Sequence, residues 1–494
     1  MSSDSSSVNT SLREILRGGS IFVLAKVITN AAGFLLNWVL IQALGTALYG
    51  IYAYARLITA TTMTITAAGM DKGVLKYVPA NADDERRDQI VSVALGTVFV
   101  FSVLIAVCLY LFAPIINQLT LQNNLLPDVL QILAITVPFY TLTTLLGAVF
   151  RSMTIVEYDA LLSKVFPRIA RLLAAVVGLL LGYTLVETVV ALAVASALVF
   201  AVAVTVFLAK TDIRARTGIE RETAFSLYNF SFPLMFSRAG TFLYKRIDVF
   251  MVGIFLTSAD VGIYNIAALL ATAIVIPLSG INQLFPPIAS ELYTNGKIDR
   301  LESVYQIVTR WAFTIAAFGA ALLVVHRTTV LSLFGDEVTA ATALFSLLVL
   351  GHLVNATAGP SNYVLMMADH QYLTMINQWA FGLLNVALNY VLLTQFGLIG
   401  AAIGTMTSLS LLNVVRVIQV WYLEKIVPYS WQFAKPIAAC IIATLLMVMV
   451  KPLFTGYSQL LFGGTVGGVT FLLLLYVFGI EEEDESFVRE EIIN

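Results

Sequence analysis

The sequence predicts an all-α polytopic membrane protein, and three observations lead to that fold class. Of its 494 residues, 59% are hydrophobic and only 12% are charged, and the mean hydropathy is +0.88. A soluble protein carries about 25% charged residues, so half of the usual solvating charge is missing. Long apolar stretches recur along the whole chain, with short polar loops between them. Soluble, disordered and fibrous classes are therefore excluded.

Fourteen segments are long and apolar enough to cross a bilayer as helices, which takes roughly 20 residues each. Pro233, near the start of the seventh segment, favours a bend there. Residues 1–18 are polar and lack the apolar core of a signal peptide, so we expect no cleaved leader. The fourteen predicted spans lie near residues 20–43, 49–68, 90–112, 128–150, 166–183, 187–209, 228–256, 261–287, 304–325, 338–358, 373–394, 398–423, 433–451 and 459–479.

The distribution of cations among the loops predicts the orientation. Eighteen Lys and Arg residues fall on the side of the amino terminus, whereas the opposite side holds only Arg327 and Lys451. Loops rich in Lys and Arg stay in the cytoplasm. We therefore expect both termini to be cytoplasmic and the protein to span the cell membrane. The net charge of −2 provides no basic field for nucleic acid.

An internal repeat divides the chain. A shift of 212 residues places Tyr49–Tyr52 on Val261–Tyr264 and Lys26 on Arg238. Duplicated halves with a substrate site between them are typical of transporters. The predicted organisation is two six-helix lobes in parallel orientation plus two C-terminal helices. Its parts are a cytoplasmic tail (1–18), an N-lobe (19–209), a cytoplasmic linker (210–227), a C-lobe (228–425), the last two spans (433–479) and an acidic tail (480–494).

Cations within the spans outnumber acids. A cation near the bilayer centre costs about 3 kcal/mol or more, so it is expected to face protein or water. Only one acid, Asp248, lies deep inside a span. Arg171, Arg310 and Arg416 lie near predicted cytoplasmic ends, where their long stems can reach the interface. The other cations are the candidate residues of a substrate-binding cavity: Lys26, Arg56, Arg238, Lys245 and Arg246.

Asp248 and several amides have two readings each. Asp248 could pair with Lys245 or Arg246 to tether its helix, or it could couple transport to an ion gradient. Asn30 and Asn37 share a polar stripe with Lys26 in the first span. Gln378, Asn385 and Asn389 form a second stripe in the eleventh span. Such amides suit sugar hydroxyls, but they also serve as contacts between packed helices.

Metal, nucleotide and disulfide chemistry find no support in the sequence. The three histidines, His326, His352 and His370, do not pair with a cysteine or an acid at ligand spacing. The two cysteines lie in apolar runs, and the chain has no phosphate-binding loop for ATP. We therefore expect no metal, no cofactor and no ATP.

Several segments resemble Wzx-type oligosaccharide flippases, which share a superfamily with multidrug and toxin extruders and lipid II flippases. The similar segments are Gly45–Tyr52, Arg246–Gly253, Val261–Asn265, Gln283–Ser290 and Gly397–Ala402. The resemblance implies alternating access by two lobes around a cationic cavity. It also implies a polyprenyl-(pyro)phosphate-linked oligosaccharide that moves from the cytoplasmic to the outer leaflet, with glycan-assembly enzymes as candidate partners.

Two other functions are considered. A cation-coupled drug exporter of the same superfamily would favour acids in its cavity, but the first six spans contain no deep Asp or Glu. A membrane glycan polymerase or ligase would need acids or bases on a substantial outer loop. The longest outer loop, 113–127, has only about fifteen residues. The expected protein is thus a transporter rather than an enzyme.

Overall fold

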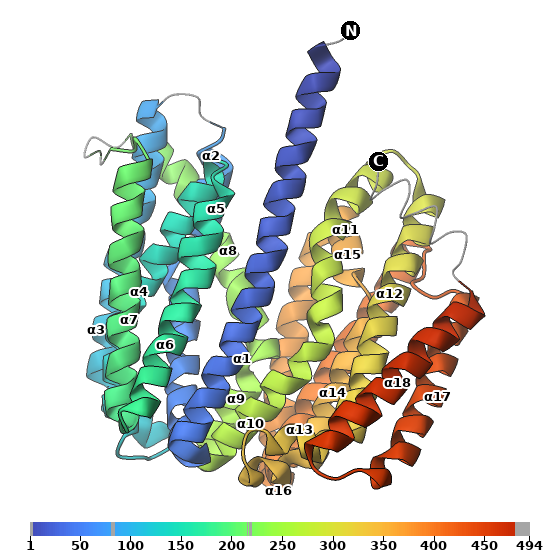
Figure 1. Ribbon diagram of the computed structural model, residues 1–494. Coiled ribbons are helices and arrows are strands. Elements are labelled where there is room, and N and C mark those ends of the chain that lie inside the picture. Colours follow the sequence, from blue (N-terminus) through green and yellow to red (C-terminus); the bar gives the residue numbers. More distant parts are fainter. Residues whose placement is uncertain (1–2, 81–83, 215, 217–219, 480–494) are drawn as a thin grey trace. The chain divides into compact units, whose positions relative to one another are not determined.

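The computed structural model describes residues 3–80, 84–214, 216 and 220–479, and within these ranges it contains helices and no strand (Figure 1). Side chains are described from Val27 onward, except those of residues 236–241 and 243–245. Ten helical segments are long and apolar enough to cross a membrane. The predicted fold class, an all-α polytopic membrane protein, is confirmed.

The chain divides into two compact units, each of which is described by itself. Unit 1 consists of Met1–Ala239 and Leu256–Gly262, and unit 2 consists of Gly240–Phe255 and Ile263–Asn494. The first part of α8 thus packs with unit 1: Leu227 belongs to its core, and the Tyr228 hydroxyl lies 2.7 Å from that of Thr97.

Unit 1 is built from helices that carry the first six predicted spans. Predicted spans 90–112, 128–150 and 187–209 each lie within a single helix, because each is one uninterrupted apolar stretch. The elements of this unit are α1 (Ser3–Thr66), α2 (Met70–Tyr77), α3 (Asp84–Leu119), α4 (Leu126–Ser152), α5 (Val156–Tyr158), the π-helix η1 (Asp159–Val165), α6 (Phe166–Leu180), α7 (Leu185–Lys210) and most of α8 (Arg221–Lys245).

Helix α1 contains two predicted spans because it reverses at Gly45. Gly45 has φ 73° and ψ 172°, a conformation that L side chains avoid. The Tyr49 hydroxyl donates to Asn37 Oδ1 at 2.6 Å. Twelve residues of straight helix would separate these two positions by about 18 Å, so the contact requires the chain to turn back.

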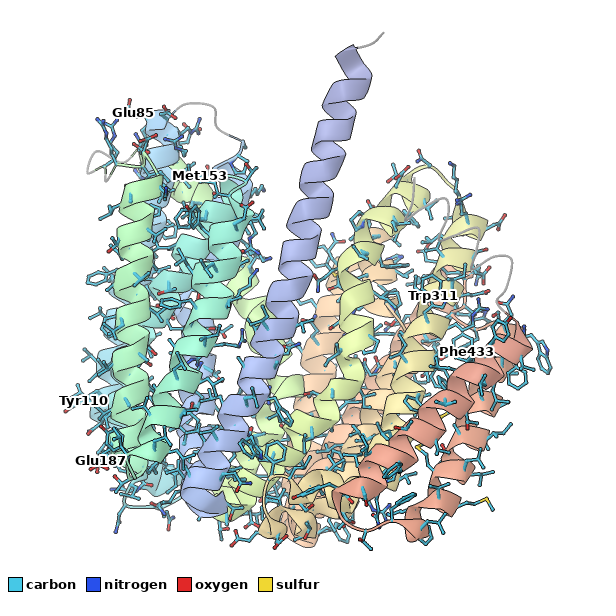
Figure 2. All side chains as sticks on the ribbon, in the orientation of Figure 1. Glu85, Tyr110, Met153, Glu187, Trp311 and Phe433 are labelled. Carbon is cyan, nitrogen blue, oxygen red and sulfur yellow. The ribbon has the colours of Figure 1, made fainter. Side chains whose placement is uncertain are left out.

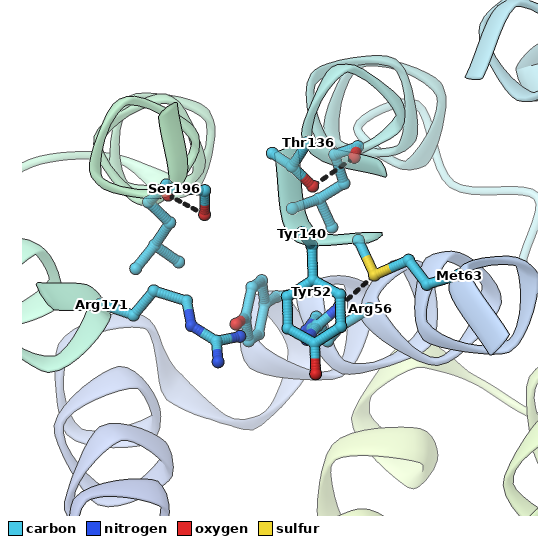
Figure 3. Close-up of a pocket in the computed structure, with 9 residues that line it drawn as sticks. Tyr52, Arg56, Met63, Thr136, Tyr140, Arg171 and Ser196 are labelled. Atoms are coloured by element: carbon cyan, nitrogen blue, oxygen red, sulfur yellow. Dashed lines mark hydrogen bonds between the residues drawn. The ribbon is translucent and has the colours of Figure 1, made fainter. Parts of the chain in front are cut away.

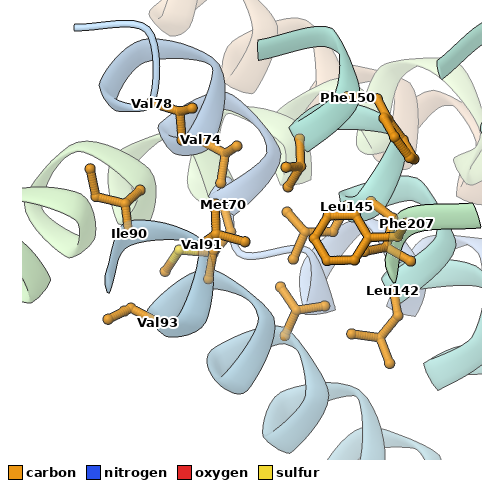
Figure 4. Close-up of a cluster of buried hydrophobic side chains, with 14 of the residues drawn as sticks. Met70, Val74, Val78, Ile90, Val91, Val93, Leu142, Leu145, Phe150 and Phe207 are labelled. Carbon is orange, nitrogen blue, oxygen red and sulfur yellow. The ribbon is translucent and has the colours of Figure 1, made fainter. Parts of the chain in front are cut away.

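The apolar core of unit 1 gathers between α2, α3, α4 and α7. Val91, Val149 and Phe150 are fully buried there, and Phe207 packs edge-on to Phe150 with the ring centroids 5.9 Å apart (Figure 4). By contrast, the last third of α3 leaves Leu111 65% exposed, and its neighbour Tyr110 lies at the outer edge of the helices (Figure 2). Such a helix face is suited to lipid, where apolar side chains need no protein partner.

Unit 2 carries the second part of the seventh predicted span and nearly all of the spans that follow it. Predicted spans 304–325, 433–451 and 459–479 each coincide with one helix. The elements of this unit are α9 (Ile247–Phe255), most of α10 (Ser258–Ala271), the 3₁₀-helix η2 (Thr272–Val275), α11 (Ile276–Thr294), α12 (Ile298–Val325), α13 (Arg327–Ser332), η3 (Asp336–Ala341), α14 (Thr342–Thr357), α15 (Ser361–Met367), α16 (Gln371–Glu424), η4 (Trp431–Phe433), α17 (Ala434–Val450), η5 (Lys451–Leu453) and α18 (Tyr457–Phe478).

Helix α16 is a second helical hairpin, which reverses at Gly397 (φ 60°, ψ −141°). The amides of Asn377 and Gln419, 42 residues apart, donate to each other at 2.6 and 3.1 Å. Ser408 also donates to the Phe381 carbonyl at 2.8 Å. Polar side chains therefore join the two arms, as expected for helices that pack in lipid.

The seventh predicted span is interrupted. Pro233, where a bend is expected, lies inside α8, which continues through this residue. The helical structure is interrupted at Arg246, between α8 and α9. Near this break the Phe250 amide is 3.5 Å from the Arg246 carbonyl, a long hydrogen bond.

The repeated tetrads contact each other within unit 1. The 212-residue shift carries Thr46 onto Ser258 and Gly50 onto Gly262. A Cβ on Gly50 would lie 1.7 Å from the Ser258 carbonyl oxygen, and one on Gly262 would lie 2.3 Å from that of Thr46. The contact is reciprocal, and the absence of side chains lets α1 and α10 approach this closely.

Candidate functional site

A pocket in unit 1 brings together polar and cationic side chains from four helices (Figure 3). It holds about 310 Å³ of unfilled space, including its open mouth. Its lining comes from the second arm of α1, from α4, from α6 and from α7: Tyr52, Arg56, Met63, Leu133, Thr136, Tyr140, Arg171, Leu192 and Ser196.

Arg56, one of the predicted cavity residues, lines this pocket. Its guanidinium carbon lies 5.6 Å from the centroid of the Tyr140 ring, and its Nη1 lies 3.5 Å from Met63 Sδ. The ring face offers a cation–π contact, and the thioether is a weak acceptor. No carboxylate lies within 4 Å of Arg56 among the described side chains, so its charge stays uncompensated there.

Arg171 faces the same pocket, so the prediction that its stem reaches the cytoplasmic interface is wrong. The physical reason is the length of the helix before it. Helical structure begins at Val156 and continues through the π-helix into α6, which places Arg171 fifteen residues inside rather than five. Its Nε donates to the Pro167 carbonyl at 3.1 Å.

Arg310 and Arg416 also depart from the prediction that they reach the interface. They are only 5% and 7% exposed, and both lie inside unit 2. Arg310 is in the middle of α12, because that helix begins at Ile298, before the apolar run. Both side chains have interaction partners, and they lie inside the unit rather than at its surface.

Asp248 is the centre of a buried polar network in unit 2. It is 4% exposed and lies in the first turn of α9. Its Oδ2 accepts a hydrogen bond from the Tyr264 hydroxyl at 2.7 Å and from the Thr405 hydroxyl at 3.3 Å, and its Oδ1 accepts from the Val249 amide at 2.8 Å. A buried carboxylate needs such donors, since burial of a polar group without them is costly.

The network continues to the amide stripe of α16. Asn389 Nδ2 donates to Asn385 Oδ1 at 2.7 Å and lies 3.4 Å from the Thr405 hydroxyl. Both asparagines are buried, at 1% and 0% exposure. Gly404 faces Asn389 and leaves no room for a side chain between the arms. These contacts favour helix packing for Asn385 and Asn389, and their role as sugar contacts stays a prediction.

The other amides differ in their surroundings. Asn37 donates to the Gly33 carbonyl at 2.7 Å and accepts from Tyr49, so it joins the two arms of α1. Asn30 is exposed, and Gln378 is partly buried, with its Oε1 unpartnered among the described residues. Of the two, only Asn30 presents its amide at the surface of the described structure, because Gln378 Oε1 is buried.

The remaining predicted cations cannot all be placed. The side chains of Lys26, Arg238 and Lys245 lie outside the described ones, although their backbones belong to α1 and α8. Arg246 is described and exposed at the break between α8 and α9. In the part of the chain that is described, the partners of Asp248 are hydroxyls and an amide rather than Arg246.

Two tyrosines of these sites could have been found in the sequence. Tyr52 lines the pocket in unit 1, Tyr264 binds Asp248 in unit 2, and the two residues match under the 212-residue shift. The repeat was therefore a usable signal. Thr405 carried no such signal, because its contact with Asp248 spans 157 residues of sequence. Among the described residues, no group of three or more His, Cys, Asp or Glu side chains could hold a metal.

Comparison with known proteins identifies the family. Residues 15–291, more than half of the chain, match the family described as polysaccharide biosynthesis protein. The chain belongs to this family. Residues 233–391 of this polysaccharide biosynthesis protein also match the family described as MatE. These matches confirm the resemblance to Wzx-type flippases and their superfamily.

Two curated relatives of this polysaccharide biosynthesis protein come from Haloferax volcanii. The probable low-salt glycan biosynthesis flippase Agl15 is 27% identical over 260 residues, which is 52% of each chain. The probable flippase AglR is 27% identical over 226 residues, 44% of this chain and 45% of AglR. The chain thus matches about half the length of each of these relatives.

Solved structures share the fold of this polysaccharide biosynthesis protein at low sequence identity. The lipid II flippase MurJ in an inward closed conformation matches 92% of this chain and 98% of its own, with a TM-score of 0.72 and 13% identity. A MATE family multidrug resistance transporter in an inward-facing conformation covers 82% and 98%, with a TM-score of 0.71 and 13% identity.

Proposed function

We propose that this protein is a flippase for a lipid-linked oligosaccharide, a transporter rather than an enzyme. The cargo would be a glycan joined through phosphate or pyrophosphate to a polyprenyl tail, moved from the cytoplasmic to the outer leaflet of the cell membrane. Membership in the polysaccharide biosynthesis protein family supports this class, as do two relatives named as probable flippases. Both termini are proposed to be cytoplasmic, in keeping with the bias of loop cations.

The observation that carries the proposal is the surplus of cations over acids within the spans. Arg56 and Arg171 share a pocket in unit 1 without a carboxylate among the described side chains, and Arg246 is exposed. Low-dielectric walls focus the field of such charges on an anionic group. Lys26, Arg238 and Lys245 are proposed to add to the same cationic cavity, which would open to each side of the membrane in turn.

A leaflet-resolved assay in vesicles tests this proposal. A fluorescent polyprenyl-pyrophosphate glycan is reconstituted with the protein, and the fraction that reaches the opposite leaflet is followed with a membrane-impermeant quencher. We expect transfer with the wild type and loss of transfer with K245A/R246A, because two cations of the cavity are missing.

The matched control for this assay is K297A/R327A, which removes two exposed cations outside the proposed cavity and should transfer normally. Transfer by K245A/R246A at the wild-type rate would show that the cationic cavity is wrongly assigned. A wild type without transfer would contradict the flippase function itself.

We further propose that Asp248 couples transport to an ion gradient. Support comes from its burial among Tyr264, Thr405 and Val249, with no Lys or Arg within ion-pairing distance among the described side chains. A carboxylate without an ion pair can gain a proton or an ion without breaking one. The charged and titratable groups that influence this region are Arg246 and, on α14, His352.

Replacement of Asp248 by asparagine keeps the shape and removes the charge. We expect D248N to insert normally and to lose the stimulation of glycolipid transfer by an imposed proton or sodium gradient. The control is D260N, which changes a partly buried aspartate in the first turn of α10 that accepts hydrogen bonds from Thr257. Full stimulation in D248N would leave the membrane potential, acting on the bound anion, as the driving force.

A further inference from the structure

The chain between the end of α16 and the start of α17 carries exposed aromatic side chains. Trp431 is 91% exposed, and Tyr429 just before it is exposed as well. Trp421 and Tyr422, at the end of α16, are also exposed. Rings of this kind bury about 150–250 Å² each when they are covered. Several uncovered rings in one short segment therefore mark a surface that contacts something outside the chain.

Unit 2 holds this segment in place through residues that point inward. Ile426 is buried in an apolar core together with side chains of α11, α12 and α15. The Val427 amide donates to Glu302 Oε1 at 3.0 Å, which ties the segment to α12. Phe433, labelled in Figure 2, is also buried and packs on Phe313, with the ring centroids 5.7 Å apart. The exposed rings are therefore directed outward by the fold itself.

The position of the segment along the chain places it at one face of the membrane. One membrane-crossing stretch ends at Glu424, and the next begins at Trp431. A connection this short stays close to the layer of lipid headgroups. Trp and Tyr are enriched at this level, because the ring suits the apolar side and the N–H or O–H suits the polar side. Among the described residues the indole N–H of Trp431 has no hydrogen-bond partner, so it is available to that layer.

Lys425 adds one positive charge to these rings. Its Nζ lies 5.1 Å from the centroid of the Tyr422 ring and 5.9 Å from that of Trp421, within the range of cation–π contacts. Lys425 ends α16 with φ 62°, a conformation that glycine takes more often. Among the described side chains no carboxylate lies within 4 Å of this ammonium group, and the neighbouring Glu424 contacts His370 instead. The charge is therefore available to an anionic group outside the chain.

The aromatic surface of this segment consists of Trp421, Tyr422, Lys425, Tyr429 and Trp431. We propose that it docks on the headgroup layer and binds an anionic phospholipid of the bilayer. Lys425 contacts the lipid phosphate as a point charge, and the rings lie level with the lipid backbone. A protein partner is disfavoured, because it would have to displace the headgroups that surround this level of the helices. The bound lipid stays in its leaflet and is not cargo, so this inference is independent of the proposed function.

Fluorescence of Trp431 in lipid nanodiscs tests the docking on the full-length protein. The chain has five tryptophans, so the emission of Trp431 is obtained as the difference between the wild type and W431F. The nanodiscs contain phosphatidylcholine with bromine on the acyl chains, either near the glycerol or near the chain end, and unbrominated nanodiscs are the control. We expect the emission of a partly dehydrated indole, quenched at least about twofold more by bromine near the glycerol, because the ring lies at the interface.

The same difference emission measures the preference for an anionic lipid. Brominated phosphatidylglycerol is added in increasing share to unbrominated phosphatidylcholine, and quenching of Trp431 is followed. We expect half of the full quenching at a lower share than with brominated phosphatidylcholine. K425Q should raise that share about fivefold, because one cation at an anionic surface is lost, and K425R should keep the wild-type value. The matched control is K297Q, which removes an exposed lysine that precedes α12 and should behave as the wild type.

The outcomes separate this inference from the proposed function. Water-like emission of Trp431 that no brominated lipid quenches overturns the docking, and it is the result expected if a protein covers the surface. Equal half-quenching shares for K425Q and the wild type overturn the binding of an anionic lipid through Lys425. The depth measurement leaves Lys425 unchanged, so the docking stays testable if K425Q does not fold. A protein that docks in this way but moves no glycolipid contradicts the flippase function and leaves this inference intact.

Discussion

Two buried aspartates, Asp248 and Asp159, differ in the groups that surround their carboxylates. Asp248 is surrounded by hydroxyl and amide donors, whereas Asp159, the first residue of η1 in unit 1, is 2% exposed and pairs with Lys164 at 3.1 Å and Arg151 at 3.5 Å. Burial lowers the pKa of Lys164, while Asp159 opposes that effect. One carboxylate is thus tied to cations in an ion pair, whereas the other is held by neutral hydrogen-bond donors.

The surroundings of His326 predict how the stability of the protein depends on pH. The side chain is fully buried at the end of α12, and neither ring nitrogen has a hydrogen-bond partner among the described residues. Burial and the nearby Lys451 hold the pKa of His326 below its ordinary value. The unfolded chain therefore binds a proton more readily than the folded one. Stability is fully present above about pH 6.5 and falls as the pH drops toward the lowered pKa, by up to about 1.4 kcal/mol per pH unit.

Thermal unfolding of the detergent-solubilised protein between pH 7.5 and pH 5 measures this effect. H326L removes the titrating ring and its unpartnered nitrogens, so it should lose part of the acid sensitivity and keep its stability at neutral pH. The control is H370L, which removes a histidine that contacts Glu424 at 3.0 Å and leaves His326 in place. Acid sensitivity that is identical in H326L and the wild type would contradict the prediction.

At the scale of elements, the sequence predicted where most helices lie, but not how far Arg171 and Arg310 lie from the start of theirs. Uninterrupted apolar runs such as 90–112 became single helices, and the reversals at Gly45 and Gly397 fall between predicted spans, because glycine at positive φ turns the chain. The depth of Arg171 and Arg310 was missed for one reason. Their helices begin in polar segments at Val156 and Ile298, and hydropathy detects the apolar run rather than the start of the helix.

The site was predictable only in part, since its partners are distant in sequence. Asp248 was found as the one deep acid, and Asn385 and Asn389 were found from helical spacing. Their connection through Thr405 depends on how α16 packs against α9, which no local pattern contains. Arg56 was found as one of the cations within the predicted spans, but its pocket with Arg171 arises only when α1 and α6 come together.

The close approach of α1 and α10 predicts that a side chain at Gly50 destabilises the protein. A methyl group at Gly50 would meet the Ser258 carbonyl oxygen at 1.7 Å, and backbone cannot move aside cheaply. We expect G50A to lower the free energy of unfolding by about 1–3 kcal/mol, as overpacking does elsewhere. Thermal unfolding in detergent provides the measurement.

The matched control for this packing is G33A, also in α1. Nothing lies within 4 Å of a Cβ at Gly33, so alanine should be neutral or stabilise the helix by up to about 1 kcal/mol. Equal stability of G50A and G33A would show that the two helices do not need to approach so closely.

At the scale of the whole molecule, the proposed function depends on where the charged residues lie. The chain has nearly balanced totals, 28 Lys and Arg against 30 Asp and Glu, but the acids are almost all outside the spans. Cations that remain inside the membrane are costly, so each must face protein or water. We interpret those that line the pocket or are exposed, unlike the buried Arg310 and Arg416, as the attraction for the proposed anionic cargo. A multidrug exporter for cationic compounds would face repulsion from Arg56, Arg171 and Arg246, which is why the phosphorylated glycolipid is favoured.

Two cargoes that differ only in the charge of their linkage test whether the protein selects an anionic lipid. Proteoliposomes receive either a fluorescent polyprenyl-pyrophosphate glycan or the same glycan on the same tail through an uncharged ether linkage, and transfer between leaflets is measured for each. We expect rapid protein-dependent transfer of the phosphorylated lipid and only background transfer of the uncharged one. Equal protein-dependent rates for the two lipids would contradict it.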